Sequence, residues 1–423
     1  MSELSYLEKL LDGVVVEWKT LGEVAKYIRG LTYSKSNESA DGQGYRILRA
    51  NNITLSSNCL NLNDVKVVKF DTKVKDSQKL YKDDILISAA SGSREHVGKV
   101  AYIESDIDYY FGGFMGVVRC DEKLNPRYLF HVLTSDIFQK YLDEMLNSST
   151  INNLNSAVMG GFKIPIPCPN KPDKSLAIQA EIVRILDKFT ALTAELTAEL
   201  SIRKKQYNHY RDLLLSFEEG EVEWKTLGEM GTLIRGKRFV KADIIPKGVP
   251  CIHYGEMYTH YSIWANRAKS YISVELASKL RKASCGDVVF VSAGETIADI
   301  GRGTAWLGDE DVVIHDACFF YKSSLNPKYV AYFSRTNFFH DQIKKSISSG
   351  KISAINAKGF EKVIIPVPSP EEQARIVAFL DKFDTLTSSI TEGLPREIEL
   401  RQKQYEYYRD LLFSFPKPET ASN

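Results

Sequence analysis

The stretch "VEWKTLGEVAKYIRG" at residues 16–30 decides the fold, because it returns as "VEWKTLGEMGTLIRG" at residues 222–236 with 11 of 15 positions identical. A second stretch behaves in the same way. "RKKQYNHYRDLLLSF" at residues 203–217 returns as "RQKQYEYYRDLLFSF" at residues 401–415, again with 11 of 15 identical. Self-similarity at a fixed period marks a repeated structural unit. The chain is therefore predicted to contain two copies of one unit of about 200 residues.

Each copy has two parts. The first mixes short β-rich runs, such as "DILIS" and "GDVVFVSA", with loops rich in glycine, asparagine and serine, which predicts a mixed α/β domain. It ends in a proline-rich stretch, "IPIPCPNKPDKS" in one copy and "IPVPSPEEQ" in the other. The second part has apolar residues three and four positions apart, as on one face of a helix. In the first copy these are Ile178, Ile182, Ile185, Phe189, Leu192, Leu196 and Leu200.

A helix of about 40 residues would be roughly 60 Å long. A single apolar stripe on such a helix needs a partner, and the helix of the other copy is the obvious one. We therefore expect an α+β, mixed fold, in which two α/β domains are separated by two long antiparallel helices that form a coiled-coil rod with an approximate two-fold repeat. Two helices, each packed on its own domain, are the alternative. The side chains expected to pack on the helices are Phe189, Leu192, Tyr207, Leu213, Phe383, Tyr405 and Leu411.

The repeat also suggests domain boundaries. These are a stub resembling a helix end (1–15), the first α/β domain (16–170), a central helix (171–219), the second α/β domain (220–370), a C-terminal helix (371–415) and a tail (416–423). Gly393 and Pro395 predict a kink or break in the C-terminal helix.

Composition narrows the class of protein. A hydrophobic content of 43% and a charged content of 26% are those of a soluble globular protein. The net charge of +1 gives no hint of nucleic acid, so any basic surface must come from local clustering. Six scattered cysteines without a C-x-x-C pair argue against a zinc ribbon and a disulfide framework. Without an apolar run of about 18 residues, no membrane span is expected, and a cytoplasmic location is predicted.

Two related domains at a fixed separation suit a ligand with two sites at a fixed separation, and double-stranded DNA is the most common such ligand. The interiors of the two copies differ: "GYRILRANNITLSSN" (44–58) stands where the other copy has "GVPCIHYGEMYTHYS" (248–262). This divergence predicts two different half-sites. The candidate base contacts are Arg46, Arg49, Asn51 and Asn52 in the first copy, and His253, Tyr254 and Glu256 in the second. Exposed turn residues of no special role would look similar.

Two pairs of loops are candidates for phosphate contacts. "SAASGSREHVGK" (88–99) corresponds to "SAGETIADIGRG" (292–303), and "NSSTINNLN" (147–155) corresponds to "SSGKISAIN" (348–356). Such loops can present backbone N–H groups, hydroxyls and cations to phosphates, although ordinary surface loops share this composition. The candidates are Ser91, Arg94, Lys99, Ser149, Asn152, Arg302, Ser349 and Lys351.

Motifs of catalysis are missing. The sequence contains no G-x-x-x-x-G-K-[ST] phosphate loop and no Asn/Asp-Pro-Pro-aromatic tetrapeptide of adenine methylases, and its seven histidines are dispersed. We therefore expect neither an enzyme nor a metal site.

The central helix carries a tandem tetrapeptide, "TAELTAEL" at residues 193–200. Four residues add about 6 Å and roughly 400° of turn, so a copy changes the length of a helix while nearly preserving which face meets a partner. Thr193, Leu196, Thr197 and Leu200 thus mark a spacer. Half-sites of three or four base pairs, centred about 10 base pairs apart, leave about six base pairs between them.

Together the duplicated "EWKTLGE", the proline-rich exit into a helix with "LDKF", and "KKQYNHYRDLL" resemble the specificity (S) subunits of type I restriction–modification systems, along essentially the whole chain. The tandem "TAEL" resembles the type IC branch. The resemblance implies two target recognition domains on a helical scaffold that holds two modification (M) subunits, which bind S-adenosylmethionine and methylate adenine. Restriction (R) subunits join through the M complex and add ATP- and Mg-dependent cleavage, so no cofactor is expected on this chain. A two-headed protein-interaction scaffold is the alternative, and a complete methyltransferase is disfavoured by the missing motifs.

Overall fold

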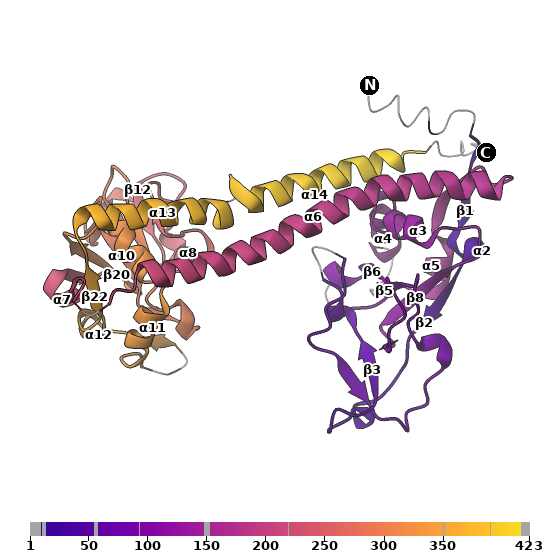
Figure 1. Cartoon of the computed structure of the whole chain (residues 1–423), viewed down its shortest axis with the longest axis horizontal. Coiled ribbons are helices and arrows are strands. Elements are labelled where there is room, and N and C mark those ends of the chain that lie inside the picture. Colours follow the sequence, from indigo (N-terminus) through magenta and orange to yellow (C-terminus); the bar gives the residue numbers. More distant parts are fainter. Residues whose placement is uncertain are drawn as a thin grey trace. The chain divides into compact units, whose positions relative to one another are not determined.

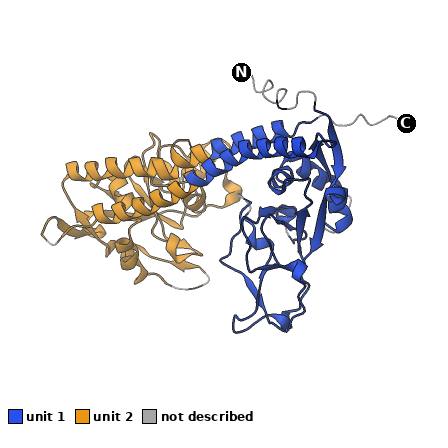
Figure 2. Ribbon diagram, turned by 45° about the vertical axis from the view of Figure 1, so that its right-hand side comes forward, with its two compact units in different colours: residues 1–195, 399–423 blue, residues 196–398 orange. Residues whose placement is uncertain are grey.

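The computed structural model describes residues 10, 14–54, 58–92, 94–147, 153–218, 220–348, 350, 352–389 and 391–415. The chain divides into two compact units, which Figure 2 colours separately: residues 1–195 with 399–423 form unit 1, and residues 196–398 form unit 2. Each unit contains one mixed α/β head, which confirms the predicted mixed α/β class of the two domains. We call residues 16–167 the first head and residues 223–367 the second head. Helices α6 (Pro172–Leu214) and α14 (Gly393–Leu412) each contribute to both units.

The first head contains two main sheets (Figure 1). The antiparallel four-stranded sheet has the order β2 (Ala25–Arg29), β8 (Met115–Cys120), β5 (Ile85–Ser88), β6 (Val100–Tyr102), and the three-stranded sheet has the order β4 (Lys66–Val68), β3 (Tyr45–Leu48), β7 (Tyr110–Phe111). A separate pair joins β1 (Val16–Thr20) to β9 (Lys163–Pro167). The helices and 3-10 turns are α2 (Leu21–Val24), α3 (Pro126–Leu133), α4 (Asp136–Asn147), α5 (Ser156–Gly161), η1 (Lys35–Asn37), η2 (Ala50–Asn52), η3 (Asp76–Gln78) and η4 (Arg94–His96).

The second head repeats this plan with longer sheets. Its five-stranded sheet has the order β11 (Gly231–Arg235), β20 (Cys318–Ser323), β16 (Val288–Val291), β18 (Gly303–Trp306), β13 (Trp264–Ala265). Its four-stranded sheet has the order β14 (Ser270–Ile272), β12 (Val249–Ile252), β19 (Val312–Ile314), β15 (Lys282–Ala283). Two further pairs are β10 (Glu223–Thr226) with β22 (Ile364–Val367), and β17 (Ala293–Gly294) with β21 (Ser353–Ala354). The helices and 3-10 turns are α7 (Leu227–Met230), α8 (Glu256–Thr259), α9 (Val274–Ala277), α10 (Pro327–Phe333), α11 (Asn337–Lys344), α12 (Ala357–Glu361), η5 (Lys241–Asp243) and η6 (Ile297–Asp299).

The duplicated "EWKTLGE" forms the same structure in both heads. Its strand pairs antiparallel with the proline-rich strand that closes the head. The chain then turns into a short helix through a capping box, in which a glutamate accepts from the backbone N–H of a threonine three residues earlier. The Thr20 N to Glu23 Oε2 and Thr226 N to Glu229 Oε2 distances are both 2.7 Å. Local sequence therefore fixes how each head begins.

The two "NP" sequences start equivalent helices. Asn125 caps α3 and Asn326 caps α10, each accepting from two backbone N–H groups, with proline at the first helical turn. Each helix buries a tyrosine whose hydroxyl donates to a carbonyl of the proline-rich strand. The distances are 2.8 Å from Tyr128 to Pro165 O and 3.0 Å from Tyr329 to Pro366 O. These contacts fasten each helix to the strand pair that closes its head.

In unit 1 the first part of α6 packs with the last part of α14. The buried side chains are Ile178, Ile182 and Leu186 from α6, and Tyr405 and Leu412 from α14, with Phe413 and Phe415 beyond. The rings of Phe189 and Tyr408 stack at 5.1 Å between centroids. The predicted stripe needs one correction: Leu186 is fully buried, whereas Ile185 is only half-buried. Steps of four from Ile178 keep to the inner face, and Ile185 lies one residue, about 100°, off that line.

In unit 2 the last part of α6 packs with α13 (Pro370–Ser388). The ring of Tyr210 contacts those of Phe379 and Phe383, with centroids 6.1 and 5.7 Å apart. Leu213, which we expected on the packing face, is 56% exposed, and Leu215 is buried instead. Leu192 of unit 1 is likewise 37% exposed. Leu215 directly follows the last residue of α6. Two residues correspond to about 200° of helical turn, so the Leu213 and Leu215 side chains point to opposite sides.

The C-terminal helical segment is broken, as Gly393 and Pro395 predicted. Helix α13 ends at Ser388 and α14 begins at Gly393, which has a φ of 75°. Only glycine adopts this conformation at little cost. A Cβ atom here would also lie 2.4 Å from Thr385 O, so Gly393 permits the close approach of the two helix ends.

A buried polar joint holds the first head on its helices. Asp187 of α6 accepts from Arg127 Nε and from His131 Nε2, both at 2.9 Å. His131 Nδ1 lies 3.0 Å from the hydroxyl of Tyr405 on α14. Because a neutral imidazole has one donor and one acceptor, His131 donates to Asp187 and accepts from Tyr405. One histidine thus connects the head to both helices.

The second head uses the same positions with other residues. Asp381 of α13 accepts from the Tyr332 hydroxyl at 2.7 Å and from Lys328 Nζ at 2.8 Å. Tyr332 follows Asn326 at the same distance in sequence as His131 follows Asn125. Both heads are therefore anchored by an aspartate on a helix, but only the first anchor contains a histidine.

The histidine predicts a pH dependence of the anchor in unit 1 that the anchor in unit 2 lacks. Burial lowers the pKa of His131, against the opposing effect of Asp187, while Arg127 and Arg409 lower it further. The stability contributed by a lowered histidine pKa is present above its ordinary value of about 6.5 and is lost as pH falls below it. We expect His131→Tyr, which copies unit 2, to reduce the loss of hydrogen-exchange protection in α3 between about pH 7.5 and about pH 5.5. Tyr332→His should introduce such a loss in α10. Equal losses in wild type and His131→Tyr would contradict this assignment.

Candidate nucleic-acid interface

In the first head, two predicted residues, Arg49 and Asn51, lie together on one surface loop. Asp64 Oδ2 accepts from Arg49 Nη2 and from Asn51 Nδ2, both at 3.0 Å. The Asp64 side chain is 74% exposed, so this group faces solvent. The loop begins in η2, directly after β3. A guanidinium and an amide held side by side can form hydrogen bonds with guanine and adenine edges.

Asn52 has a different place from its neighbours. It is buried, its Nδ2 donates to the carbonyls of Asn61 and Asp64 at 2.8 and 2.9 Å, and its Oδ1 accepts from Arg49 N at 2.8 Å. Because these bonds use its amide inside the loop, we assign Asn52 to positioning Arg49 and Asn51 rather than to base contact. Burial distinguishes two adjacent asparagines that the sequence cannot.

Arg46 is exposed on β3, with its guanidinium 5.7 Å from the centroid of the Tyr109 ring. Figure 1 shows β3 at the end of the first head away from α6, whereas β5 and β6 lie nearer the helix. Arg46 therefore lies in this outer sheet. Farther along the Arg49 loop, Asn58 and Cys59 line a cavity together with Thr190 of α6 and Gln402 of α14.

In the second head, His253 and Tyr254 belong to an aromatic cluster. The His253 ring lies 4.7 Å from Tyr254 and 4.7 Å from His315, and Phe239 lies 5.1 Å from His315, between centroids. Tyr254 is 37% exposed. His315 and Phe239 were not among our candidates, because they stand far from His253 in sequence and share no motif with it.

The two imidazoles of this cluster have a defined chemistry. His253 Nδ1 accepts from Gly255 N at 3.3 Å, and His315 Nδ1 lies 3.1 Å from Ala317 N. Burial lowers the pKa of both rings, which favours the neutral form. The neutral His253 ring then carries its proton on Nε2 and is a donor there. His315 Nδ1 also lies 3.2 Å from Asp316 Oδ1, so its contacts fit either tautomer. Glu256, by contrast, is buried and accepts from His253 N at 3.0 Å and from the Ser270 hydroxyl, so it holds the loop.

The described candidates for phosphate contacts have different surroundings in the two heads. Arg94 pairs with Asp143 of α4 at 2.5 Å. Lys99 lines a cavity with Arg409 of α14, and Arg302 lines one with Arg211 of α6. Ser91 is half-buried just after β5. Ser149, Asn152, Ser349 and Lys351 lie outside the described residues.

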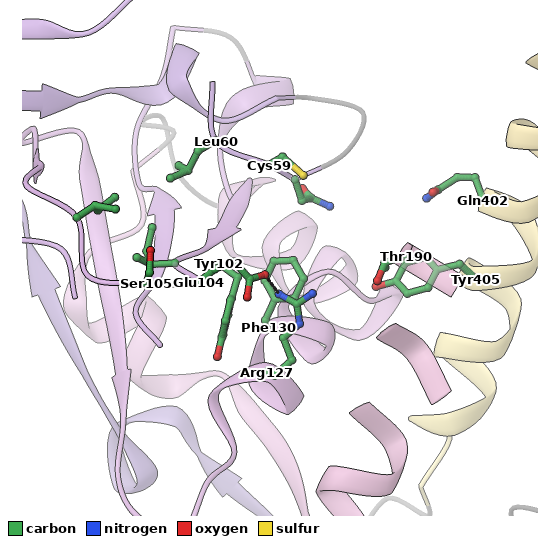
Figure 3. Close-up of a pocket in the computed structure, with 13 residues that line it drawn as sticks. Cys59, Leu60, Tyr102, Glu104, Ser105, Arg127, Phe130, Thr190, Gln402 and Tyr405 are labelled. Carbon is green, nitrogen blue, oxygen red and sulfur yellow. Dashed lines mark hydrogen bonds and ion pairs between the residues drawn. The ribbon is translucent and has the colours of Figure 1, made fainter. Parts of the chain in front are cut away.

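The head–helix boundary of unit 1 also contains an apolar cavity of about 340 Å³, shown in Figure 3. Tyr102 and Phe130 line it from the head, and Thr190 and Tyr405 from the helices. The Arg127 guanidinium is the cation in this wall, and Glu104 Oε1 accepts from it at 2.9 Å. The charge of Arg127 is therefore neutralised within the protein. We assign Arg127 to holding the head on its helices rather than to contacting nucleic acid.

The described residues contain neither a cluster of metal ligands nor a membrane-spanning helix. No group of three or more histidine, cysteine, aspartate or glutamate side chains there is placed to hold a metal ion. All six cysteines are free thiols. No helix in the same residues is long and apolar enough to cross a bilayer.

Comparison with known proteins gives the family. The model of the family described as "Type I restriction modification DNA specificity domain" matches twice, over residues 15–203 and 219–400. The chain is 39% identical over 448 residues to the specificity subunit of the type I restriction enzyme EcoR124I/EcoR124II of Escherichia coli, covering 100% of both proteins. It is 34% identical over 407 residues to that of EcoprrI, also of Escherichia coli, covering 93% of each.

A solved structure has the same fold. It comes from work on complex assembly and conformational transition of the type I R-M system. The TM-score is 0.58 at 17% identity, covering 94% of this chain and 97% of the other. Because the family match spans both repeats and the relatives match along the whole chain, this protein belongs to the type I restriction–modification DNA specificity family.

Proposed function

We propose that this chain is the DNA-recognition subunit of a type I restriction–modification enzyme. Each head is a target recognition domain, and the two heads together bind an asymmetric bipartite target. The observation that carries this proposal is the family match over both repeats, combined with different polar side chains on a shared frame. The chain itself catalyses no step. Adenine methylation and ATP-dependent cleavage belong to the partner subunits, with S-adenosylmethionine, ATP and Mg bound there.

Exposed apolar side chains on the helices support docking of two M subunits, through which R subunits join. They are Leu192, Leu400 and Tyr407 in unit 1, and Ile202, Tyr210, Leu213 and Phe379 in unit 2. Clustered apolar side chains left in water indicate a surface that a partner covers. We further propose that the helical segments form an antiparallel rod with two-fold repetition, bounded as the sequence suggested. As in the type IC branch, its tetrapeptides would set a DNA spacer of about six base pairs.

Within the first head, Arg46, Arg49 and Asn51 are proposed to contact bases, and within the second His253 and Tyr254. Arg94, Lys99, Ser91 and Arg302 are proposed as phosphate contacts. The Asp64 contacts support the first group, because they orient Arg49 and Asn51 before DNA arrives. Ser149, Asn152, Ser349 and Lys351 stay phosphate-contact candidates from sequence.

The test is binding of the M-containing complex to duplexes carrying the target mapped from methylated adenines. We expect affinity to fall steeply with salt. Asn51→Ala or Arg46→Ala should cost about 1–3 kcal/mol on the target and relax one base position. Arg94→Ala is the matched phosphate variant and should weaken all duplexes alike. A uniform loss with Asn51→Ala would make it a phosphate contact.

A protein-interaction scaffold is the second candidate, and the net charge of +1 favours it. It predicts partner binding without salt-sensitive binding of duplex DNA. The salt series on wild-type protein therefore separates the two functions before any variant is made.

A further inference from the structure

Unit 2 contains a polar cavity of about 340 Å³ between the second head and its helices. Three guanidinium groups line it from three different elements: Arg211 from α6, Arg302 from the segment before β18, and Arg335 from the turn between α10 and α11. The other polar lining residues are Tyr207, Ser262, Asp299, His340, Asp384 and Ser388. Of these residues, only Arg302 was singled out by its loop sequence as a phosphate contact.

Among these three arginines, Arg335 is the one with a buried N–H donor that has no acceptor in the described residues. Arg211 pairs with Asp212 at 2.8 Å, and Arg302 pairs with Asp299 at 2.9 Å. Among the described residues, Arg335 bonds only to carbonyls, with its Nη2 donating to Ser262 O at 3.2 Å and Gly303 O at 3.0 Å. Its Nε is buried with no hydrogen-bond partner there. A buried donor without an acceptor is costly, so this guanidinium lacks a partner that an anion would supply.

The electrostatics of the cavity agree with this geometry. Burial lowers the pKa of His340, and the cations Arg335, Lys344, Arg211 and Arg302 lower it further. Burial also raises the pKa of Asp384, although a hydrogen bond from Ser388 and the charge of Arg335 oppose the rise. The carboxyl group that could balance the arginines is thus biased toward its neutral form. With three arginines against the two carboxyl groups of Asp299 and Asp384, the lining has a formal charge of +1 when His340 is neutral.

Unit 1 has a related cavity that lacks this feature. It measures about 470 Å³ and is lined by Lys99, Thr134, Gln139 and Arg409, among others. Thr134 follows Asn125 at the distance at which Arg335 follows Asn326. Arg409 is neutralised there, with Asp410 at 3.0 Å and Asp136 at 3.7 Å. The positive cavity is therefore a property of the second copy and not of the shared frame.

We propose that the cavity lined by Arg211, Arg302 and Arg335 binds one oxyanion of the phosphate class. Planar guanidinium groups match the paired oxygens of phosphate, and converging guanidiniums from separate elements are the usual form of such a site. The oxyanion can be a free phosphate or a backbone phosphate of bound DNA. Only the second source rests on the proposed function.

The first experiment titrates the full-length chain with inorganic phosphate in a calorimeter, in a buffer free of other oxyanions. We expect one site, and at least a tenfold weaker affinity in Arg335→Gln. Arg335→Lys keeps the charge but not the forked geometry, so it should fall between the two. Lys344→Gln is the matched control, since it removes a nearby charge on α11 that lies outside the cavity lining, and it should bind like wild type.

A second readout needs no variant. Phosphate in the cavity should raise the pKa of His340, which NMR of its imidazole follows in wild-type protein. If Arg335→Gln is much less stable than wild type, its calorimetry cannot be interpreted, and the NMR titration of wild-type protein tests phosphate binding instead. A saturable rise supports the site, and an unmoved His340 with no calorimetric heat counts against free phosphate.

The DNA source has its own test. If phosphate does not bind but Arg335→Gln lowers the salt slope of DNA binding by about one, the oxyanion is a DNA phosphate. No phosphate binding together with an unchanged slope would overturn the proposal. A wild-type protein without salt-sensitive DNA binding would instead count against the proposed function, and the phosphate titration would still stand.

Discussion

Leu213→Asp is expected to abolish docking of an M subunit on unit 2 while leaving the melting temperature of the chain unchanged. Leu213 is 56% exposed near the end of α6, so a charge there costs the fold little. Tyr210, 39% exposed, precedes it by three residues and therefore lies on the same helical face. Phe379, 42% exposed, contacts the Tyr210 ring. These three side chains form an apolar patch that a partner would cover.

A central apolar contact of an interface is worth about 2 kcal/mol or more, and a buried unpaired carboxylate costs further free energy. Copurification of chain and M subunit, with stoichiometry from mass measurement, tests the loss. Val274→Asp is the matched control: Val274 is 72% exposed on α9 of the second head, away from the patch. Normal M stoichiometry with Leu213→Asp would show that the patch is not the docking surface.

Phe189→Asp, unlike Leu213→Asp, is expected to lower the stability of the chain itself. The Phe189 ring is half-buried and stacks on Tyr408 inside unit 1. Any loss of M binding with this variant should therefore accompany a lower melting temperature, unlike the loss with Leu213→Asp. The sequence predicted that both residues pack on the helices, whereas only Phe189 is half-buried and Leu213 is 56% exposed.

The sequence predicted those parts of the fold that depend on residues close together in the chain. The break at Gly393 depends on neighbouring residues and lies where expected. The Thr-Leu-Gly-Glu capping boxes and the Asn-Pro helix starts are equally local, although we did not predict them. The duplication extended this information to both heads.

The parts that sequence missed depend on contacts between distant segments. Asn51 and Asn52 are adjacent, yet only contacts with Asn61 and Asp64 turn one inward and leave the other exposed. His315 joins His253 through the pairing of β12 with β19. Arg335 meets Arg211 because a head packs on a helix. The spacing of residues along one segment does not predict which distant segment it will contact.

A third Thr-Ala-Glu-Leu copy inserted after Leu200 is expected to lengthen the DNA spacer by about one base pair and leave both half-site sequences unchanged. This prediction rests on the proposed function. The division between the two units falls between Glu195 and Leu196, inside the tandem repeat. Thr193 is bonded within its own helix, its hydroxyl donating to Phe189 O at 2.9 Å. An insertion here therefore adds helix between the units and alters neither head.

The expected size follows from helix geometry. Four residues add about 6 Å and exceed a full turn by roughly 40°, so Leu196 and Leu200 keep nearly the same face. Six ångströms correspond to almost two base-pair steps of about 3.4 Å, and part of the change should be absorbed at the break before Gly393. Insertion of two alanines is the matched control. It adds only about 3 Å but turns the following helix by roughly 200°, so the stripe faces the wrong side and specific methylation should be lost. Mapping methylated adenines in cells that carry each version measures spacer and half-sites together. An unchanged spacer, or altered half-sites, would show that the repeat does not set the distance.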